Sequence, residues 1–154
     1  MTQQAATAAT PGLTWMGILR LGLVQAAIGG VVVLTTSTLN RIMVVELALP
    51  ALLPGLLVAL HYVVQVMRPR MGYGSDLGGR RSPWIIGGMA ALVLGAIGAA
   101  AGTGLMATNL VAGIVVATLA FVLIGLGVGA CGTTLLVLMA KRVAPRRLAA
   151  AATV

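Results

Sequence analysis

Acidic residues are almost absent from this sequence: its 154 residues include two Asp or Glu side chains, one His and one Cys. Glu46, His61 and Asp76 lie far apart along the chain. The sequence therefore has no pair of carboxylates, no cluster of metal ligands and no phosphate-binding loop, and we expect no enzyme, no catalytic residue and no metal site. The lone Cys131 excludes an internal disulfide bond and is expected to be a small buried residue.

Charged residues of either sign are also few. They make up 8% of the chain, whereas hydrophobic residues make up 60% and the mean hydropathy is +1.09. A soluble domain usually contains about 25% charged residues and a smaller share of apolar ones. A chain of this composition cannot keep its apolar surface out of water, so lipid must surround most of it.

Four long apolar runs account for this composition. A spanning helix needs about 20 mostly apolar residues, and its backbone hydrogen bonds must be satisfied within the segment. Since no alternating strand pattern is present, the runs predict an all-α integral membrane protein with about four transmembrane helices. Within a transmembrane region 15–147, the expected helices cover residues 21–39, 44–67, 84–105 and 110–139.

The two ends of the chain differ from this region. Residues 1–14 are small and polar and lack the features of a signal peptide, so we expect a flexible cytoplasmic tail. Residues 148–154 are apolar again after a basic stretch. We expect them to be the start of a truncated fifth helix, with the natural protein continuing beyond it.

Eight of the ten Lys and Arg residues of the chain, whose net charge is +8, are gathered in two places. The clusters lie between the second and third runs and after the fourth, and consist of Arg68, Arg70, Arg80, Arg81, Lys141, Arg142, Arg146 and Arg147. Clusters in short loops mark the cytoplasmic side of a bacterial inner membrane. We therefore expect both termini in the cytoplasm. We expect no binding of nucleic acid, because the charges follow membrane topology.

Small residues and prolines indicate how the helices pack. The third run carries a stripe at every fourth position, formed by Gly87, Ala91, Gly95 and Ala99. Such a stripe lets helix backbones approach closely in lipid. Pro50 and Pro54 fall inside the second predicted helix and are expected to bend it.

The connector between the second and third runs carries the most specific motif. Residues 72–81 read GYGSDLGGRR and match the pattern G-x-x-x-D-x-x-G-R-R. The residues of the motif are Gly72, Asp76, Gly79, Arg80 and Arg81. At this position the motif resembles the signature cytoplasmic loop of the major facilitator superfamily, although Leu77 stands where a basic residue is common. We expect Asp76 and Arg80 to hold helix ends together. The alternative is a loop that only sets topology.

Two further stretches narrow the resemblance. Residues 30–46 read GVVVLTTSTLNRIMVVE, which places Asn40, Arg41 and Glu46 near the expected outer face. Residues 68–76 read RPRMGYGSD. With these stretches the chain resembles, over nearly its whole length, the PucC/LhaA family of phototrophic purple bacteria.

The resemblance implies a major-facilitator-like fold of about twelve helices, of which this chain would be the N-terminal third. It implies an assembly factor for photosynthetic light-harvesting complexes that handles or delivers bacteriochlorophyll within the membrane. The implied partners, besides the lipid bilayer, are antenna polypeptides, the reaction-centre–antenna complex and pigment-synthesis enzymes. The implied location is the cytoplasmic or intracytoplasmic photosynthetic membrane.

Polar side chains inside the apolar runs are candidates for function because they are costly in lipid. A neutral imidazole can ligate the magnesium of a bacteriochlorophyll, so His61 is a candidate pigment ligand, with hydrogen bonding inside the bundle as the alternative. Gln25 and Gln65 are expected to pack between helices. Arg41 and Glu46 can pair with each other, with headgroups or with another protein.

Two other functions stay open. A secondary transporter of a small solute usually carries charged or polar groups near the middle of its helices, and these runs offer few. A small structural subunit of a membrane complex would be complete with four helices.

Overall fold

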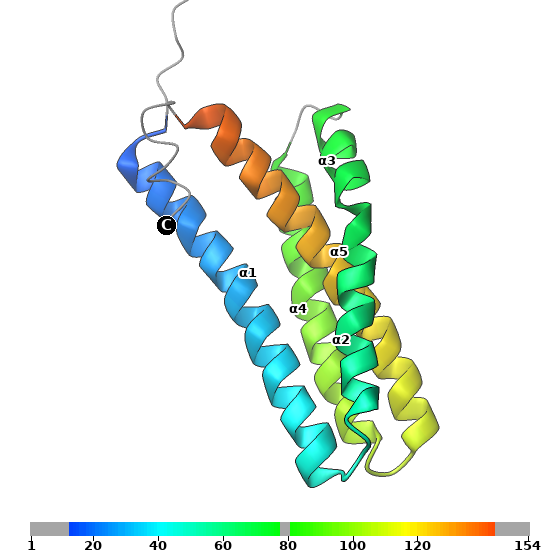
Figure 1. The fold of residues 1–154 in the computed structure, drawn as a ribbon. Helices are drawn as coiled ribbons and strands as arrows, with labels where there is room; N and C mark the ends of the chain where they lie inside the picture. Colours follow the sequence, from blue (N-terminus) through cyan, green and yellow to red (C-terminus); the bar gives the residue numbers. More distant parts are fainter. Residues whose placement is uncertain (1–12, 78–80, 144–154) are drawn as a thin grey trace, which may run out of the picture.

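The chain forms a bundle of long helices in a computed structural model that describes residues 13–77 and 81–143 (Figure 1). The helical elements are α1 (Trp15–Arg41), the π-helical turn η1 (Ile42–Glu46), α2 (Leu52–Val64), the 3₁₀ turn η2 (Gln65–Met67), α3 (Arg68–Leu77), α4 (Ser82–Leu105) and α5 (Leu110–Arg142). These described ranges contain no strand. Residues 1–12 of the expected tail, Gly79, Arg80 and the expected fifth-helix start lie outside them.

Four helical stretches of the described chain are long and apolar enough to cross a membrane. They are Trp15–Glu46, Leu52–Leu77, Ser82–Leu105 and Leu110–Arg142. The prediction of an all-α membrane protein with four spanning segments is therefore confirmed. Several of the bounds differ from the prediction, and the largest shift of a helix start, that of the second span, has a local cause.

The turn between the first two spans lies later than predicted. The second segment was expected to begin at Val44, but Val44 lies in η1, which prolongs the first helix. The backbone N–H of Leu49 donates to the carbonyl of Met43 (2.9 Å), so the end of the helix keeps its hydrogen bonds while the chain reverses over residues 47–51. The apolar run continues through this end, and hydropathy alone therefore misplaced the turn.

The two prolines do not lie in the interior of α2, contrary to the prediction. Pro50 belongs to the turn, and its carbonyl accepts a hydrogen bond from the N–H of Leu53 (2.9 Å). Pro54 lies in the first turn of α2, where backbone N–H groups have no partner within the helix. The missing donor of each proline therefore costs little, and the prolines help to define where α2 begins.

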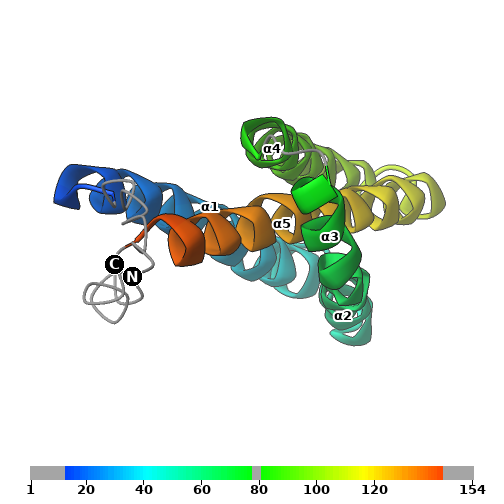
Figure 2. The ribbon, with the colours of Figure 1, turned by 90° about the horizontal axis from the view of Figure 1, so that it is seen from above.

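Helix α5 is the central helix of the bundle. It contacts α1, α2, α3 and α4, and Figure 2 shows it crossing the middle, with α4 on one side and α2 on the other. Its buried side chains Phe121, Ile124 and Leu135 belong to one apolar cluster with Leu57 of α2 and Leu92 of α4. Each of the other α-helices of the described chain therefore packs against α5.

Backbone contact joins α4 to α5 along a row that we call the glycine seam: Gly88, Gly95, Gly102, Gly113 and Gly127. A Cβ atom on Gly88 would lie 2.6 Å from the backbone nitrogen of Cys131, and one on Gly102 would lie 2.7 Å from that of Ala117. No side chain fits between the helices at these points. The two backbones can approach this closely only because the seam positions lack a Cβ atom.

The predicted stripe of small residues on α4 lies only partly on the face that contacts α5. Gly95 and Ala99 are buried against α5 as expected, whereas a Cβ atom on Gly87 would meet nothing within 4 Å. Both Gly87 and Gly88 are small, and a spacing of four cannot decide which of two adjacent glycines faces the neighbouring helix. The contact with Cys131 shows that Gly88 does.

These adjacent glycines allow a matched test of the seam. Gly88→Ala should destabilise the protein by about 1–3 kcal/mol, because the new methyl group collides with backbone atoms that cannot move separately from α5. Gly87→Ala should be neutral or stabilising by about 0.5–1 kcal/mol, since it adds a better helix former in open space. Thermal unfolding of the two variants in the same detergent measures the difference, and equal melting temperatures would contradict the seam.

Candidate functional site

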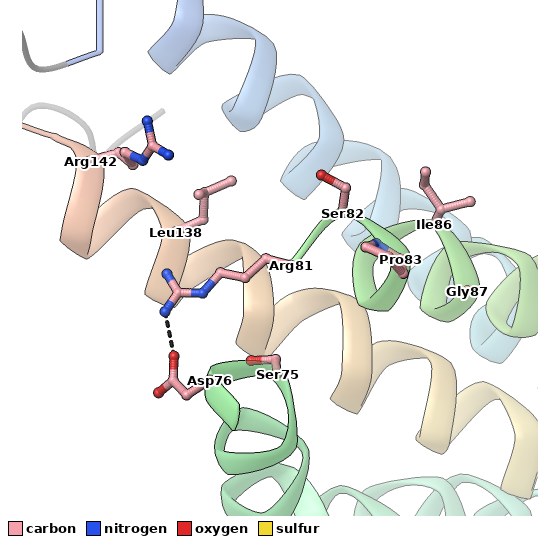
Figure 3. Close-up of a pocket in the computed structure, with 9 residues that line it drawn as sticks. All are labelled: Ser75, Asp76, Arg81, Ser82, Pro83, Ile86, Gly87, Leu138 and Arg142. Atoms are coloured by element: carbon pink, nitrogen blue, oxygen red, sulfur yellow. Dashed lines mark hydrogen bonds and ion pairs between the residues drawn. The ribbon is translucent and has the colours of Figure 1, made fainter. Parts of the chain in front are cut away.

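A carboxylate connects the ends of three helices at one end of the bundle. The Oδ1 atom of Asp76, near the end of α3, accepts hydrogen bonds from Nη2 of Arg81, directly before α4, and from Nζ of Lys141, in the last turn of α5 (3.2 Å). Figure 3 shows the Arg81 guanidinium pointing toward Asp76. The Asp76 side chain is 44% exposed and that of Arg81 is 16% exposed, so the pair with Arg81 is the better shielded of the two.

Among the described residues, the partners of Asp76 are Arg81 and Lys141. The expected partner Arg80 lies outside the described residues, so its contact with Asp76 stays a prediction. Lys141 was missed as a partner because it lies 65 residues further along the chain. Its place in the basic stretch after the fourth apolar run was the available signal, because α3 and α5 meet at the same end of the bundle.

The first part of the motif forms a helix, whereas the sequence suggested a loop. Gly72 and Asp76 both lie in α3, and the hydroxyl of the buried Ser75 donates to the carbonyl of Gly72 (2.8 Å). A Cβ atom on Gly74 would lie 3.1 Å from the ring of Trp84 in α4. The small residues therefore allow α3 to pack against its neighbours, and this packing places Asp76 beside Arg81 and Lys141.

An open pocket of about 840 Å³ lies beside this carboxylate, between the end of α3, the start of α4 and the end of α5. It is lined by Ser75, Asp76, Arg81, Ser82, Pro83, Ile86, Gly87, Leu138 and Arg142. Figure 3 shows Leu138 and Arg142 on α5 and Ser82 to Gly87 on α4, with Arg81 between them. The pocket combines cationic and hydroxyl groups with an apolar wall.

A second, apolar groove of about 410 Å³ lies between α3, α4 and α5. It is lined by Met71, Pro83, Trp84, Gly87, Gly88, Ala91, Leu123, Leu126 and Ala130. None of these side chains carries a charge, and four of the nine residues are Gly or Ala. The groove therefore presents a shallow apolar surface, and it meets the charged pocket at Pro83 and Gly87.

The residues of the other diagnostic stretch lie at the opposite end of α1. Asn40, Arg41 and Glu46 are all exposed there, and the structure does not bring them to Asp76. In the ranges that the structure describes, Arg41 and Glu46 form no ion pair with each other. Pairing of these two residues with headgroups or with another protein stays a prediction. Met43 of the same stretch is fully buried and fixes this end of α1 to the core.

His61 is fully buried on α2, where its backbone carbonyl lies beside Gly125 of α5. Its Nδ1 lies 3.0 Å from the carbonyl oxygen of Val58, so Nδ1 carries the hydrogen and donates it. Nε2 is then a free acceptor, and it has no hydrogen-bond partner among the described residues. Two further buried atoms share this property, Gln25 Oε1 and Thr134 Oγ1.

This arrangement does not fit a pigment bound to His61. The tautomer is suitable, since a free Nε2 can ligate a magnesium ion. The side chain is nevertheless 0% exposed, and a planar macrocycle could reach Nε2 only if the helices around it separated. Gln65, the other candidate from the second run, is half-buried and accepts a hydrogen bond from the side chain of Arg68.

Comparison with protein families gives a match to the model described as PUCC protein over residues 38–154. The matched region contains the Asp76 site, the apolar groove and His61. No solved structure matches the chain. The arrangement of the helices is therefore described from the residues of this chain alone.

Among curated proteins, "Bacteriochlorophyll synthase 44.5 kDa chain" of Rhodobacter capsulatus is 58% identical over 92% of this chain. "Protein PucC" of Cereibacter sphaeroides is 38% identical over 92% of this chain. An "Uncharacterized protein in puhA-bchM intergenic region" of Rhodobacter capsulatus is 36% identical over 55% of it. The chain spans about a third of the length of the first two relatives, 33% in each case.

The Asp76 site can be tested through its dependence on salt. Asp76→Asn should lower the melting temperature by less than Gly88→Ala does, because the carboxylate is partly exposed and solvent weakens such pairs. Since ion pairs of this kind are screened at about 1 M salt, the difference from the wild type should shrink when the salt concentration is raised.

Glu46→Gln is the matched control, because Glu46 is exposed at the other end of the bundle and forms no ion pair in the described chain. It should leave the melting temperature unchanged at low and at high salt. If Asp76→Asn and the wild type had equal melting temperatures at low salt, Asp76 would not hold the helix ends together. The alternative, a segment that only sets topology, would then apply to the motif.

Proposed function

The chain belongs to the PUCC protein family, and we propose on that basis that it is an assembly factor for photosynthetic light-harvesting complexes. In this proposal it handles or delivers bacteriochlorophyll within the membrane, and its clients are antenna polypeptides and the reaction-centre–antenna complex. The name of one relative refers to bacteriochlorophyll, and both relatives come from purple bacteria. Because the chain spans a third of those relatives, the activity of the whole protein is part of the proposal.

The apolar groove is the observation that supports pigment handling best. Small residues, including Ala91 and Ala130, line it together with Trp84. A lining without charged groups can contact a macrocycle without removing a charge from water. The aromatic side chain of Trp84 adds a surface for stacking. The proposal places the pigment here and assigns no ligand role to the buried His61.

The membrane location and the absence of catalysis belong to the same proposal. The four spanning stretches make the chain a membrane protein, and the photosynthetic inner membrane is the compartment in which its proposed clients are assembled. The basic clusters favour a cytoplasmic position for both termini. With two acidic residues and one His in the whole chain, we infer a role in binding and transfer, with pigment-synthesis enzymes as partners that supply the pigment.

A secondary transporter is the second candidate, and one observation favours it. Gln25, His61 and Thr134 each bury a polar atom without a partner in the described chain. Such atoms are costly inside a membrane and often mark a path for a polar solute. Uptake of labelled solutes into vesicles that contain the purified protein would support this reading, provided that antenna assembly does not depend on the protein.

Deletion of the gene in its own organism tests the assembly role. The near-infrared absorption of the antenna complexes in isolated membranes should fall during active assembly, because pigment and polypeptide are no longer brought together. A tagged protein should recover antenna polypeptides in mild detergent. Unchanged antenna absorption, with no antenna, reaction-centre or pigment-synthesis proteins recovered, would exclude the proposal and move the transporter ahead.

A pair of alanine variants tests the groove. Ala91→Leu places a larger side chain in the apolar groove and should reduce antenna absorption in the complemented deletion strain by several-fold. Ala90→Leu adds the same side chain at the adjacent, exposed position, which does not line the groove, and should restore absorption fully. Both proteins should be present in the membrane in equal amounts. Equal absorption in the two strains would count against pigment handling at this groove, whatever the deletion shows.

A further inference from the structure

The charged pocket beside Asp76 has more positive than negative charge among the described residues. Arg81 and Arg142 line the pocket, and Lys141 binds its one carboxylate. Three cations therefore face one anion, and two positive charges are left over. The only other acidic side chain of the sequence is Glu46, in η1 at the end of the first spanning stretch Trp15–Glu46. No other acidic side chain of the described residues can therefore balance these two charges.

Most of the N–H groups that the two arginines bring to this pocket have no hydrogen-bond acceptor among the described residues. The guanidinium of Arg81 carries five N–H groups, of which one is engaged by Asp76. The side chain of Arg142 has no hydrogen-bond or ion-pair partner in the described ranges. Arginine forks of this kind match the oxygen atoms of a phosphate group well. The vacant donors thus point to an anion with several oxygen atoms.

The position of the pocket along the spanning helices indicates where that anion comes from. Arg81 precedes the spanning stretch Ser82–Leu105, and Arg142 ends the stretch Leu110–Arg142. Residues at the ends of spanning helices lie at the level of the lipid headgroups. A phosphate group of the bilayer is therefore already present at this height, whereas a soluble ion would have to compete with it.

The apolar wall of the pocket distinguishes a lipid from a free phosphate. Ile86 lines the pocket and is 69% exposed, and Leu138 lies opposite it on α5 (Figure 3). A free phosphate ion gains nothing from such side chains. A phospholipid carries an acyl chain directly below its phosphate group, and this chain would cover Ile86 and Leu138.

The same combination recurs on the other side of α5. A smaller pocket of about 270 Å³ lies between α1 and α5 and is lined by Leu13, Gly17, Arg20, Leu21, Leu138 and Arg142. Arg142 and Leu138 thus stand between two pockets, each of which pairs arginine with apolar side chains. One residue, Arg142, is placed to contact a headgroup in either of them.

We propose that Arg81 and Arg142 bind the phosphate group of an anionic phospholipid in the pocket between α3, α4 and α5. Asp76 holds Arg81 in place from the opposite side, and Ile86 and Leu138 contact the acyl chain. The site rests on the charges and the cavity of the described residues and does not depend on the proposed antenna role. It would fix this end of the bundle in the anionic leaflet of the membrane.

The test compares the full-length purified protein in nanodiscs of phosphatidylglycerol and in nanodiscs of phosphatidylcholine. Native mass spectrometry should show phosphatidylglycerol bound to the wild type, with a higher melting temperature than in phosphatidylcholine. Arg142→Gln should lower the bound phosphatidylglycerol by about fivefold, the loss expected for one arginine at an anionic lipid surface. Arg142→Lys keeps the charge but loses the arginine fork, and it should bind an amount between those of Arg142→Gln and the wild type.

Arg70→Gln is the matched control, because Arg70 is exposed on α3 at the same end of the bundle and does not line the pocket. It makes the same change in net charge and should leave the bound lipid unchanged. Equal losses in Arg70→Gln and Arg142→Gln would mean unspecific surface attraction and would overturn the proposal. A rise in melting temperature with inorganic phosphate in detergent free of phospholipid would overturn the assignment to a lipid.

Discussion

The direct contact of the α4 and α5 backbones is the constraint on which the rest of the bundle depends. Lipid tails are as apolar as leucine side chains, so burial of apolar surface cannot hold two helices together inside a bilayer. Close packing has to do so, and the glycine seam provides it because its five positions lack a Cβ atom where the two backbones approach most closely. Once α5 is fixed on α4, its other faces are available for α1, α2 and α3.

The charged and apolar sites both follow from this contact. The seam extends from Gly102 near one end of α4 to Gly88, six residues after the start of the helix at Ser82. Beyond Gly88 the seam has no further member, and the charged pocket lies there between the start of α4 and the end of α5. Asp76 connects the helix ends around this pocket, while the apolar groove lies alongside the seam near Gly88.

The class of the fold was predicted well from the sequence. The position of one turn and the helix face that contacts α5 were predicted less well. Hydropathy and length identify a spanning helix reliably because lipid imposes both requirements, and all four were found. Hydropathy does not resolve a turn that is itself apolar, such as residues 47–51 between α1 and α2. Nor does spacing distinguish Gly87 from Gly88, because both are small. The glycine was decided by a contact with another helix, whereas the turn was decided by a local hydrogen bond at the end of the first helix.

The site was predicted in part for the same reason. Asp76 was found because a carboxylate among arginines is conspicuous in a chain with so few acidic groups, but Lys141 comes from a distant helix and its proximity depends on the packing of α3 against α5. His61 shows the converse. Its chemistry suggested a pigment ligand, whereas its burial removes it from reach, and burial is a property of the whole bundle that no single residue reveals.

The scarcity of acidic groups finally explains why the candidate sites lie where they do. The two carboxylic side chains of this sequence cannot balance its ten Lys and Arg side chains, so the surplus charge is available to water or to anionic partners at the membrane surface. Within the membrane the same scarcity leaves helix surfaces that differ mainly in shape. Recognition there has to rely on the fit of apolar surfaces. Small residues such as Ala91 and Ala130 shape these surfaces, because they leave a shallow groove between larger side chains.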